Sequence, residues 1–111
     1  MKILTGLIVI LILFSCKEVD CNDVKQAFYP DEYNLIVNES NIDLTWIKIN
    51  GFTPISGERS EIMVHNNWKL DSNTFEQGDT IMKRKGTLDL TVHKKDTTLL
   101  FNWYCRGKPY K

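Results

Sequence analysis

This chain of 111 residues has little of what long helices and nucleic-acid-binding surfaces require. It contains a single alanine, Ala27, and three prolines, and its 14 basic residues are balanced by 14 acidic ones. The scarcity of alanine disfavours long helices and favours strands. Without a basic excess, nucleic acid is not expected as a partner, because phosphate recognition needs clustered Lys and Arg.

Sequence motifs for metal and catalytic chemistry are also missing. The histidines His65 and His93 fall at outward positions of predicted strands, and no C-x2-C or H-x3-H spacing suits zinc. Glu58, Glu61 and Asp89 are the carboxylates considered for an acid–base pair, which geometry rather than sequence defines. A G-x-S-x-G elbow and a glycine-rich phosphate loop are absent. We therefore predict no catalytic residue, no metal and no cofactor, and we interpret these carboxylates as surface groups.

The longest apolar run is short. It covers residues 3–14, includes Thr5 and Gly6, and follows the single positive charge of Lys2. A helix that spans a bilayer needs about 20 apolar residues. A positive charge, a short apolar core and then small residues form the layout of a secretory signal peptide. We predict that residues 1–15 are such a signal, with an uncleaved N-terminal anchor as the alternative.

The segment Leu13-Phe14-Ser15-Cys16 resembles the lipobox of bacterial lipoproteins. The resemblance covers residues 1–16 and implies that a diacylglycerol is attached to the Cys16 thiol, that a peptidase cuts before Cys16, and that a fatty acid such as palmitate acylates the new amino group. Two or three acyl chains anchor a protein stably to a lipid bilayer. The following Lys17-Glu18-Val19-Asp20 favours the outer membrane, on its periplasmic face or at the cell surface.

Three cysteines are present, and an odd number in a secreted chain needs an explanation. Lipidation of Cys16 accounts for one thiol. Cys21 and Cys105 remain, and we predict that they form a disulfide in an oxidising compartment. The alternative is a free Cys21 in a flexible tether and a buried Cys105 thiol. Residues 16–22 are expected to be the lipidated tether, and residues 23–111 a single β-rich domain.

Short alternating segments separated by turn signals fill that domain. A brief helix is expected at its start, with Asn22 or Asp23 as the cap and Pro30 after the end. Asn50-Gly51 is predicted to be a turn. Strands are expected at residues 33–37, 44–49, 60–65, 68–70, 80–85, 88–93 and 99–105. The last two segments are typical of an antiparallel hairpin. The whole pattern predicts a mainly β fold, a small antiparallel β-sandwich or barrel with a short N-terminal helix.

Aromatic residues are the best candidates for a binding surface, because aromatics are enriched at binding hot spots and stack on sugar rings. The strand pattern places Trp46 and Trp103 in the core. Trp68 follows a turn, and Tyr104 falls on the face opposite Trp103. We therefore predict that Trp68 and Tyr104 are the exposed residues available for binding.

Two functions are consistent with these features. The first is an envelope lipoprotein, held to the lipid bilayer through acylated Cys16, whose small β-domain binds a protein partner. Anchored domains that neutralise toxins or host lysozymes are similar in size and build, so an immunity-like or inhibitor-like role is implied by this resemblance of architecture. The alternative is a structural or accessory envelope protein that contacts polysaccharide through exposed aromatics. An enzyme is not expected.

Overall fold

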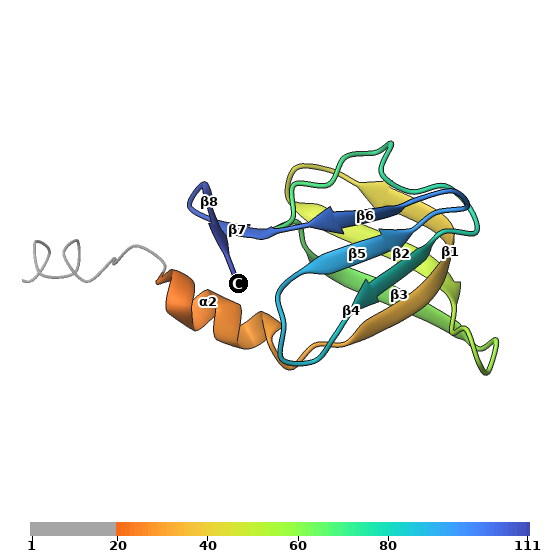
Figure 1. Cartoon of the computed structure of the whole chain (residues 1–111), viewed down its shortest axis with the longest axis horizontal. Coiled ribbons are helices and arrows are strands. Elements are labelled where there is room, and N and C mark those ends of the chain that lie inside the picture. The colour runs from red at the N-terminus through yellow and green to blue at the C-terminus, as the bar shows by residue number, and fades with distance from the viewer. Residues whose placement is uncertain (1–19) are drawn as a thin grey trace, which may run out of the picture.

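The computed structural model describes residues 20–111, so the predicted signal peptide and the lipidation site Cys16 lie outside the described residues. Within that range one helix, α2 (Cys21–Phe28), precedes the strands (Figure 1). The strands are β1 (Tyr33–Ile42), β2 (Trp46–Phe52), β3 (Arg59–His65), β4 (Thr80–Lys83), β5 (Leu90–His93), β6 (Thr98–Phe101), β7 (Trp103–Cys105) and β8 (Lys108–Tyr110). The predicted mainly β, antiparallel fold with a short N-terminal helix is confirmed.

Six strands form one antiparallel sheet in the order β3-β2-β1-β4-β5-β6. Strand β1 belongs to both halves of this sheet, because its residues 33–36 pair with β4 and its residues 36–42 pair with β2. A β-bulge between Val37 and Glu39 shifts the register with β2, and bulges bend a strand. The bend folds the sheet on itself, so that β4, β5 and β6 lie in front of β2 and β3 (Figure 1).

The predicted turn at Asn50-Gly51 is wrong, because both residues lie within β2. Gly51 pairs with Val37, next to the bulge in β1. A Cβ atom added to Gly51 would lie only 2.0 Å from the carbonyl oxygen of Ile36. Glycine is needed at this position because two backbones approach closely where β1 bends, which is a common reason for glycine inside a strand.

Two predicted strands also differ from the structure. Residues 68–70 form a loop after β3 rather than a strand. The predicted strand at residues 99–105 is divided at Asn102 into β6, which pairs with β5, and β7, which pairs with β8. The antiparallel hairpin expected from the last two segments is confirmed for β5 and β6. The hairpin of β7 and β8 is separate from the six-stranded sheet.

The core lies between the two halves of the sheet and is closed at one end by α2. Its fully buried side chains come from both halves and from the loops between them: Leu35, Ile47, Ile49, Trp68, Ile81, Leu88, Leu90, Val92 and Trp103. Phe28 of α2 packs edge-to-face against Trp68 and Trp103, with ring centroids 5.5 and 5.4 Å apart. The aromatic cluster therefore attaches the helix to the loop after β3 and to the β7–β8 hairpin.

Helix α2 begins earlier than predicted. Asp20 is the N-cap, and its carboxylate accepts a hydrogen bond from the backbone N–H of Asn22 at 2.9 Å. Cys21 is therefore part of the folded domain, where it forms the predicted disulfide with Cys105. The Cα atoms of the two cysteines are 5.9 Å apart, and their side chains are buried. A free Cys21 in a flexible tether, the alternative considered above, is wrong.

Candidate functional site

The outer face of β2 and β3 is a solvent-exposed surface that changes character along its length. The outward side chains of these strands form four cross-strand pairs: Trp46–His65, Lys48–Met63, Asn50–Glu61 and Phe52–Arg59. The end with Trp46 and His65 is mainly apolar, and the end with Asn50, Glu61 and Arg59 is polar. We call Leu44, Trp46, Met63 and His65 the apolar patch, and we call the hollow at the other end the polar hollow.

The apolar patch contains large side chains that are accessible to water. Leu44 is 97% exposed, Met63 62% and Trp46 44%. The rings of Trp46 and His65 pack edge-to-face with their centroids 5.3 Å apart. The predicted core position of Trp46 is wrong, because the alternation that buries Ile47 turns Trp46 outward. Neighbouring exposed apolar side chains of this kind are typical of interaction sites.

Leu44 is held at the tip of the β1–β2 turn by the side chain and backbone of Asp43. The Asp43 carboxylate accepts hydrogen bonds from the backbone N–H groups of Trp46 and Thr45, at 2.7 and 2.8 Å. These hydrogen bonds lower the pKa of Asp43 below its usual value, because they favour the charged carboxylate. A turn built in this way restricts the backbone. Leu44 is therefore presented to solvent by an ordered turn.

Asn66 joins this turn to the loop that follows β3. Its side-chain amide donates to the carbonyls of Asp43 and Leu70, both at 2.8 Å. Its side-chain oxygen accepts from the backbone N–H of Leu70 at 2.9 Å, and its own backbone N–H donates to the carbonyl of Thr45 at 2.8 Å. Asn66 is buried, and these bonds satisfy its side chain inside the protein. The turn and the loop therefore form one rigid rim.

A hollow of about 650 Å³ lies between this rim, helix α2 and the β7–β8 hairpin, and we call it the helix-side hollow. Val24, Phe28 and Leu44 are among its apolar lining residues. Its basic lining residues are His65, Lys69 and Arg106. Within the part of the chain that the structure describes, no Asp or Glu lines this hollow. Its surface is therefore apolar with a positive rim.

The two aromatic residues predicted for binding have different environments. Trp68 is only 1% exposed, its ring packs against Phe28, and its Nε1 donates to the carbonyl of Leu88 at 2.7 Å. The prediction that Trp68 is exposed is wrong, because its one polar group is satisfied inside the core. Tyr104 is half-buried, lies on the face opposite the buried Trp103 as predicted, and lines the helix-side hollow.

Lys69 covers Tyr104 at the wall of this hollow. Its Nζ lies 4.3 Å from the centroid of the Tyr104 ring, within range of a cation–π contact. Lys69 also has a φ of 56°, in the left-handed region that lysine seldom adopts. Two hydrogen bonds between Asn67 and the Tyr104 backbone, at 2.7 and 3.0 Å, hold the adjoining loop. Such a conformation persists where the surrounding structure enforces it.

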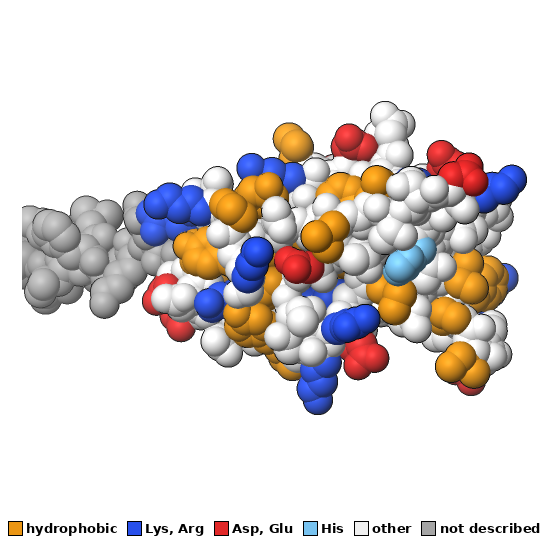
Figure 2. All heavy atoms as spheres, viewed as in Figure 1, with side chains coloured by type: hydrophobic (Ala, Val, Ile, Leu, Met, Phe, Trp, Pro, Cys, Tyr) orange, Lys and Arg blue, Asp and Glu red, His pale blue; other side chains and the backbone are white. Residues whose placement is uncertain are grey.

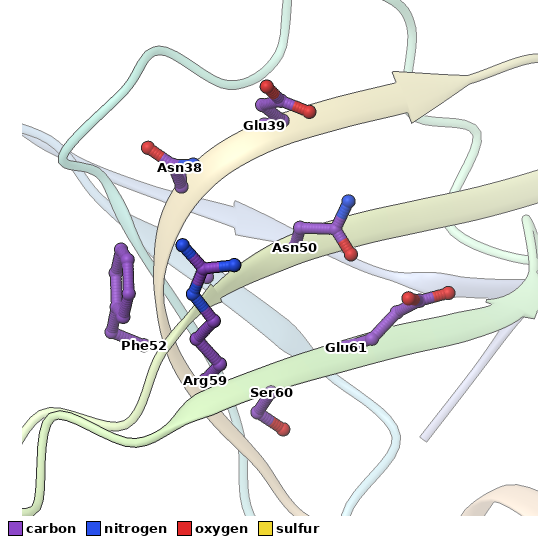
Figure 3. A pocket seen from close by; sticks show the side chains of 8 residues that line it. Asn38, Glu39, Asn50, Phe52, Arg59, Ser60 and Glu61 are labelled. Atoms are coloured by element: carbon purple, nitrogen blue, oxygen red, sulfur yellow. The ribbon is translucent and has the colours of Figure 1, made fainter.

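The polar hollow has a volume of about 520 Å³ (Figure 3). It is lined by Asn38, Glu39, Asn50, Gly51, Phe52, Arg59, Ser60 and Glu61. Asn50 pairs with Glu39 on one side and with Glu61 on the other, so its amide lies between two carboxylates. Of these residues, the sequence singled out Glu61 alone as a candidate. The hollow depends on the register of three strands, which no local pattern encodes.

The remaining candidate residues do not assemble into a catalytic or metal centre within residues 20–111. His65 and His93 are both exposed, as predicted. Glu61 and Asp89 line two different hollows, and Glu58 is exposed in a loop. This range contains no group of three or more His, Cys, Asp and Glu side chains that could hold a metal ion.

The β4–β5–β6 half and its loops contain buried charged side chains whose polar groups have partners within the domain. Lys83 is 2% exposed, and its Nζ donates to the carbonyl of Asp31 at 2.6 Å. Burial lowers the pKa of Lys83, and the nearby negative charge of Asp31 opposes that shift. Asp79 and Lys94 form a largely buried ion pair. On the visible face of this half, hydrophobic side chains are interspersed with charged ones (Figure 2).

Within residues 20–111, no helix has the length and apolar character needed to cross a membrane. No family model, no curated protein and no solved structure matches this chain. The chemistry of the surfaces described above is therefore what supports a functional assignment.

Proposed function

We propose that this chain is an envelope lipoprotein, anchored to the outer membrane through acylated Cys16, whose β-domain binds a protein partner without catalysing a reaction. The observation that carries protein binding is Leu44, a leucine that is 97% exposed on an ordered turn. Leu44 belongs to a group of exposed apolar side chains, and such patches mark interaction sites; the patch also contains Trp46, and tryptophan is enriched at binding hot spots. A residue whose backbone is already ordered also loses less conformational entropy when it binds.

The surroundings of Leu44 favour a particular partner chemistry. Trp46 and Met63 extend the apolar surface on one side. On the other side the helix-side hollow is lined by Lys69, and no Asp or Glu is among its described lining residues. Complementary charge steers association and selects partners. We infer a protein segment that presents an apolar side chain flanked by Asp or Glu.

Strand β3 offers a second means of holding such a segment. It is an edge strand of seven residues without proline, and it pairs with β2 without a bulge. An edge strand can accept a further strand through backbone hydrogen bonds. Met63 and His65 lie on β3, so a segment added to the edge would also reach the apolar patch.

The protein-binding role is tested with three versions of the full anchored chain in envelope extracts: unchanged, Leu44→Asp and Ile55→Asp. Ile55 is 100% exposed in the β2–β3 loop and outside the patch, so it is a matched control for an added carboxylate. We expect the unchanged and Ile55→Asp chains to capture the same protein, and Leu44→Asp to lose roughly tenfold or more in capture. Equal capture by all three would reject the apolar patch as the binding surface.

The anchor is tested by the intact mass of the chain from detergent-solubilised membranes. A mass equal to residues 16–111 plus acyl chains is expected. A mass equal to all 111 residues without lipid would reject the anchor and leave the capture experiment unaffected.

The alternative role, contact with polysaccharide through exposed aromatics, has lost one of its two residues because Trp68 is buried. The ring of Tyr104 is covered on one side by Lys69. A saccharide site at this location would therefore have one partly covered ring, and we do not place one here.

A further inference from the structure

The polar hollow has hydrogen-bonding capacity that the described residues leave unused. Glu39, Asn50 and Arg59 make no side-chain hydrogen bond to another residue within 20–111. Glu61 lies 3.9 Å from Lys48, which is the limit of a surface ion pair. Their side chains line one hollow and stand on three neighbouring strands (Figure 3). Hydrogen-bond donors and acceptors, both charged and neutral, are thus available together on one surface.

The arrangement of these groups is fixed by strands rather than by flexible loops. Glu39, Asn50 and Glu61 occupy one cross-strand row, and Phe52 and Arg59 occupy a neighbouring row. The bulge before Glu39 sets the position of β1 relative to β2. Sites built on strands hold their side chains more accurately than sites built on loops. The hollow therefore exists before any ligand binds.

The charges of the hollow select for a neutral ligand. The carboxylates of Glu39 and Glu61 are balanced by the cations of Arg59 and the adjacent Lys48, so neither an anion nor a cation is favoured by the sum. Carboxylates accept hydrogen bonds, guanidinium donates them, and the Asn50 amide does both. A ligand with closely spaced hydroxyls, each of which donates and accepts, can pair with all of these groups.

Phe52 adds an apolar surface at the edge of the same hollow. Its side chain is half-buried and lines the hollow next to Arg59. Ligand sites combine an apolar wall with a few convergent polar groups. A sugar ring has both features, because its hydroxyls lie at the rim and its C–H groups form an apolar face.

We propose that the polar hollow is a binding site for a neutral saccharide, with its hydroxyls bonded to Glu39, Asn50 and Arg59 and its C–H face against Phe52. This site is independent of the apolar patch, and it does not use Trp68 or Tyr104. It gives the anchored domain a contact to envelope carbohydrate in addition to its protein partner.

The test is calorimetric titration of the full chain, in a detergent without a sugar headgroup, with cellohexaose, maltohexaose and chitohexaose. Unchanged chain and Asn34→Ala are expected to bind one of these probes, since Asn34 is exposed on β1 outside the hollow. Asn50→Ala and the nearly isosteric Glu39→Gln are expected to bind about tenfold more weakly, the effect of one lost hydrogen-bonding group. Circular dichroism checks that each variant is folded.

Three outcomes would overturn the proposal: no binding of any hexasaccharide at millimolar concentration, equal binding by Asn50→Ala, or a loss in Asn34→Ala as large as in Asn50→Ala. If no saccharide binds and Asn50→Ala or Glu39→Gln reduces protein capture, the hollow belongs to the protein interface instead. Leu44→Asp is expected to bind the saccharide normally, so failure of the apolar patch and failure of this site are distinguished.

Discussion

The two halves of the folded sheet differ in strand length and in what they expose. Strands β1, β2 and β3 have ten, seven and seven residues, whereas β4, β5 and β6 have four each. The long half carries both candidate binding surfaces on its outer face. In the short half, Lys83 of β4 is buried, and Asp79 directly before β4 is buried as well. Long paired strands can present many side chains in a fixed register, which is what a binding surface needs.

Gly51→Ala is expected to lower the free energy of unfolding more than any other substitution considered below, and it acts on the long half. The added Cβ would overlap the carbonyl oxygen of Ile36, and neither backbone can move without disturbing the bend in β1. We expect a loss of more than about 5 kcal/mol, beyond the 1–3 kcal/mol typical of overpacking against side chains. Denaturant unfolding measures this. Gly57→Ala is the contrasting variant, because nothing lies within 4 Å of its added Cβ and only its positive φ is strained.

The second prediction concerns the disulfide that attaches α2 to the end of the chain. Replacing both Cys21 and Cys105 by serine should lower the free energy of unfolding by roughly 4–5 kcal/mol, the chain-entropy value for a loop of this length. The double variant is compared with unchanged chain under reducing and oxidising conditions. A reductant should reproduce the loss in unchanged chain and have no effect on the double variant. An unchanged unfolding midpoint after verified reduction would contradict the prediction.

The third prediction compares two tryptophans that the sequence pattern placed the wrong way round. Trp68→Ala should cost about 3–5 kcal/mol, because it leaves a cavity and removes the hydrogen bond to Leu88. Trp46→Ala should cost less than about 1 kcal/mol in stability, because the ring is exposed, and should reduce partner capture. Thermal unfolding and capture are measured on both. A larger stability loss in Trp46→Ala would contradict the assignment of the apolar patch.

The fourth prediction is a pH dependence of stability from Tyr33, where β1 meets β4. Burial raises the pKa of Tyr33 above its ordinary value of 10.0, and the nearby Asp31 carboxylate adds to this. Above pH 10 the unfolded chain loses this proton while the folded chain retains it, so stability should fall as pH rises. Tyr33→Phe should flatten that part of the curve. An identical alkaline slope in Tyr33→Phe would show that other groups cause the loss.

The smallest effect is expected from Asp43→Ala, which loosens the turn that carries Leu44. Global stability should change little, because the carboxylate is exposed and its hydrogen bonds are local. Partner capture should fall a few-fold, less than in Leu44→Asp, because only the ordering of Leu44 is lost. Acidification should act in the same direction: the carboxylate bonds persist above the ordinary pKa of 3.8 and are lost as pH falls through the lowered pKa. Capture equal to that of unchanged chain would show that the turn does not contribute.

Much of the fold was predictable because its signals are local. Period-two alternation predicted β2 as a strand but assigned its Trp46 face to the core, whereas Ile47 and Ile49 face inward. The hairpin of β5 and β6 followed from two alternating runs around a polar turn. The Cys21–Cys105 pair followed from cysteine number and compartment. The helix start was missed by a few residues, because Asp20, Asn22 and Asp23 are all suitable caps and only the packing of Cys21 selects among them.

The candidate surfaces were not predictable in the same way. Asn50-Gly51 has the composition of a turn, yet both residues lie within β2 and pair with β1, whose backbone leaves no room for a Cβ at Gly51. Trp68 follows a turn, yet the core closes over it, whereas Trp46 alternates with buried residues and faces solvent. The polar hollow depends on the register of three strands, which includes a bulge in β1 that the sequence pattern does not reveal. Each of these features depends on which elements meet in space.

The mainly β, antiparallel class, the short N-terminal helix and the pairing of Cys21 with Cys105 could be inferred from the sequence. These depend on the composition and spacing of neighbouring residues and on the number of cysteines. The tertiary structure alone decided that Leu44 and Trp46 are exposed, that Trp68 is buried, and that Glu39, Asn50 and Arg59 share one hollow. The physical reason is that alternation defines two faces of a strand, but only packing against another element decides which face is removed from water.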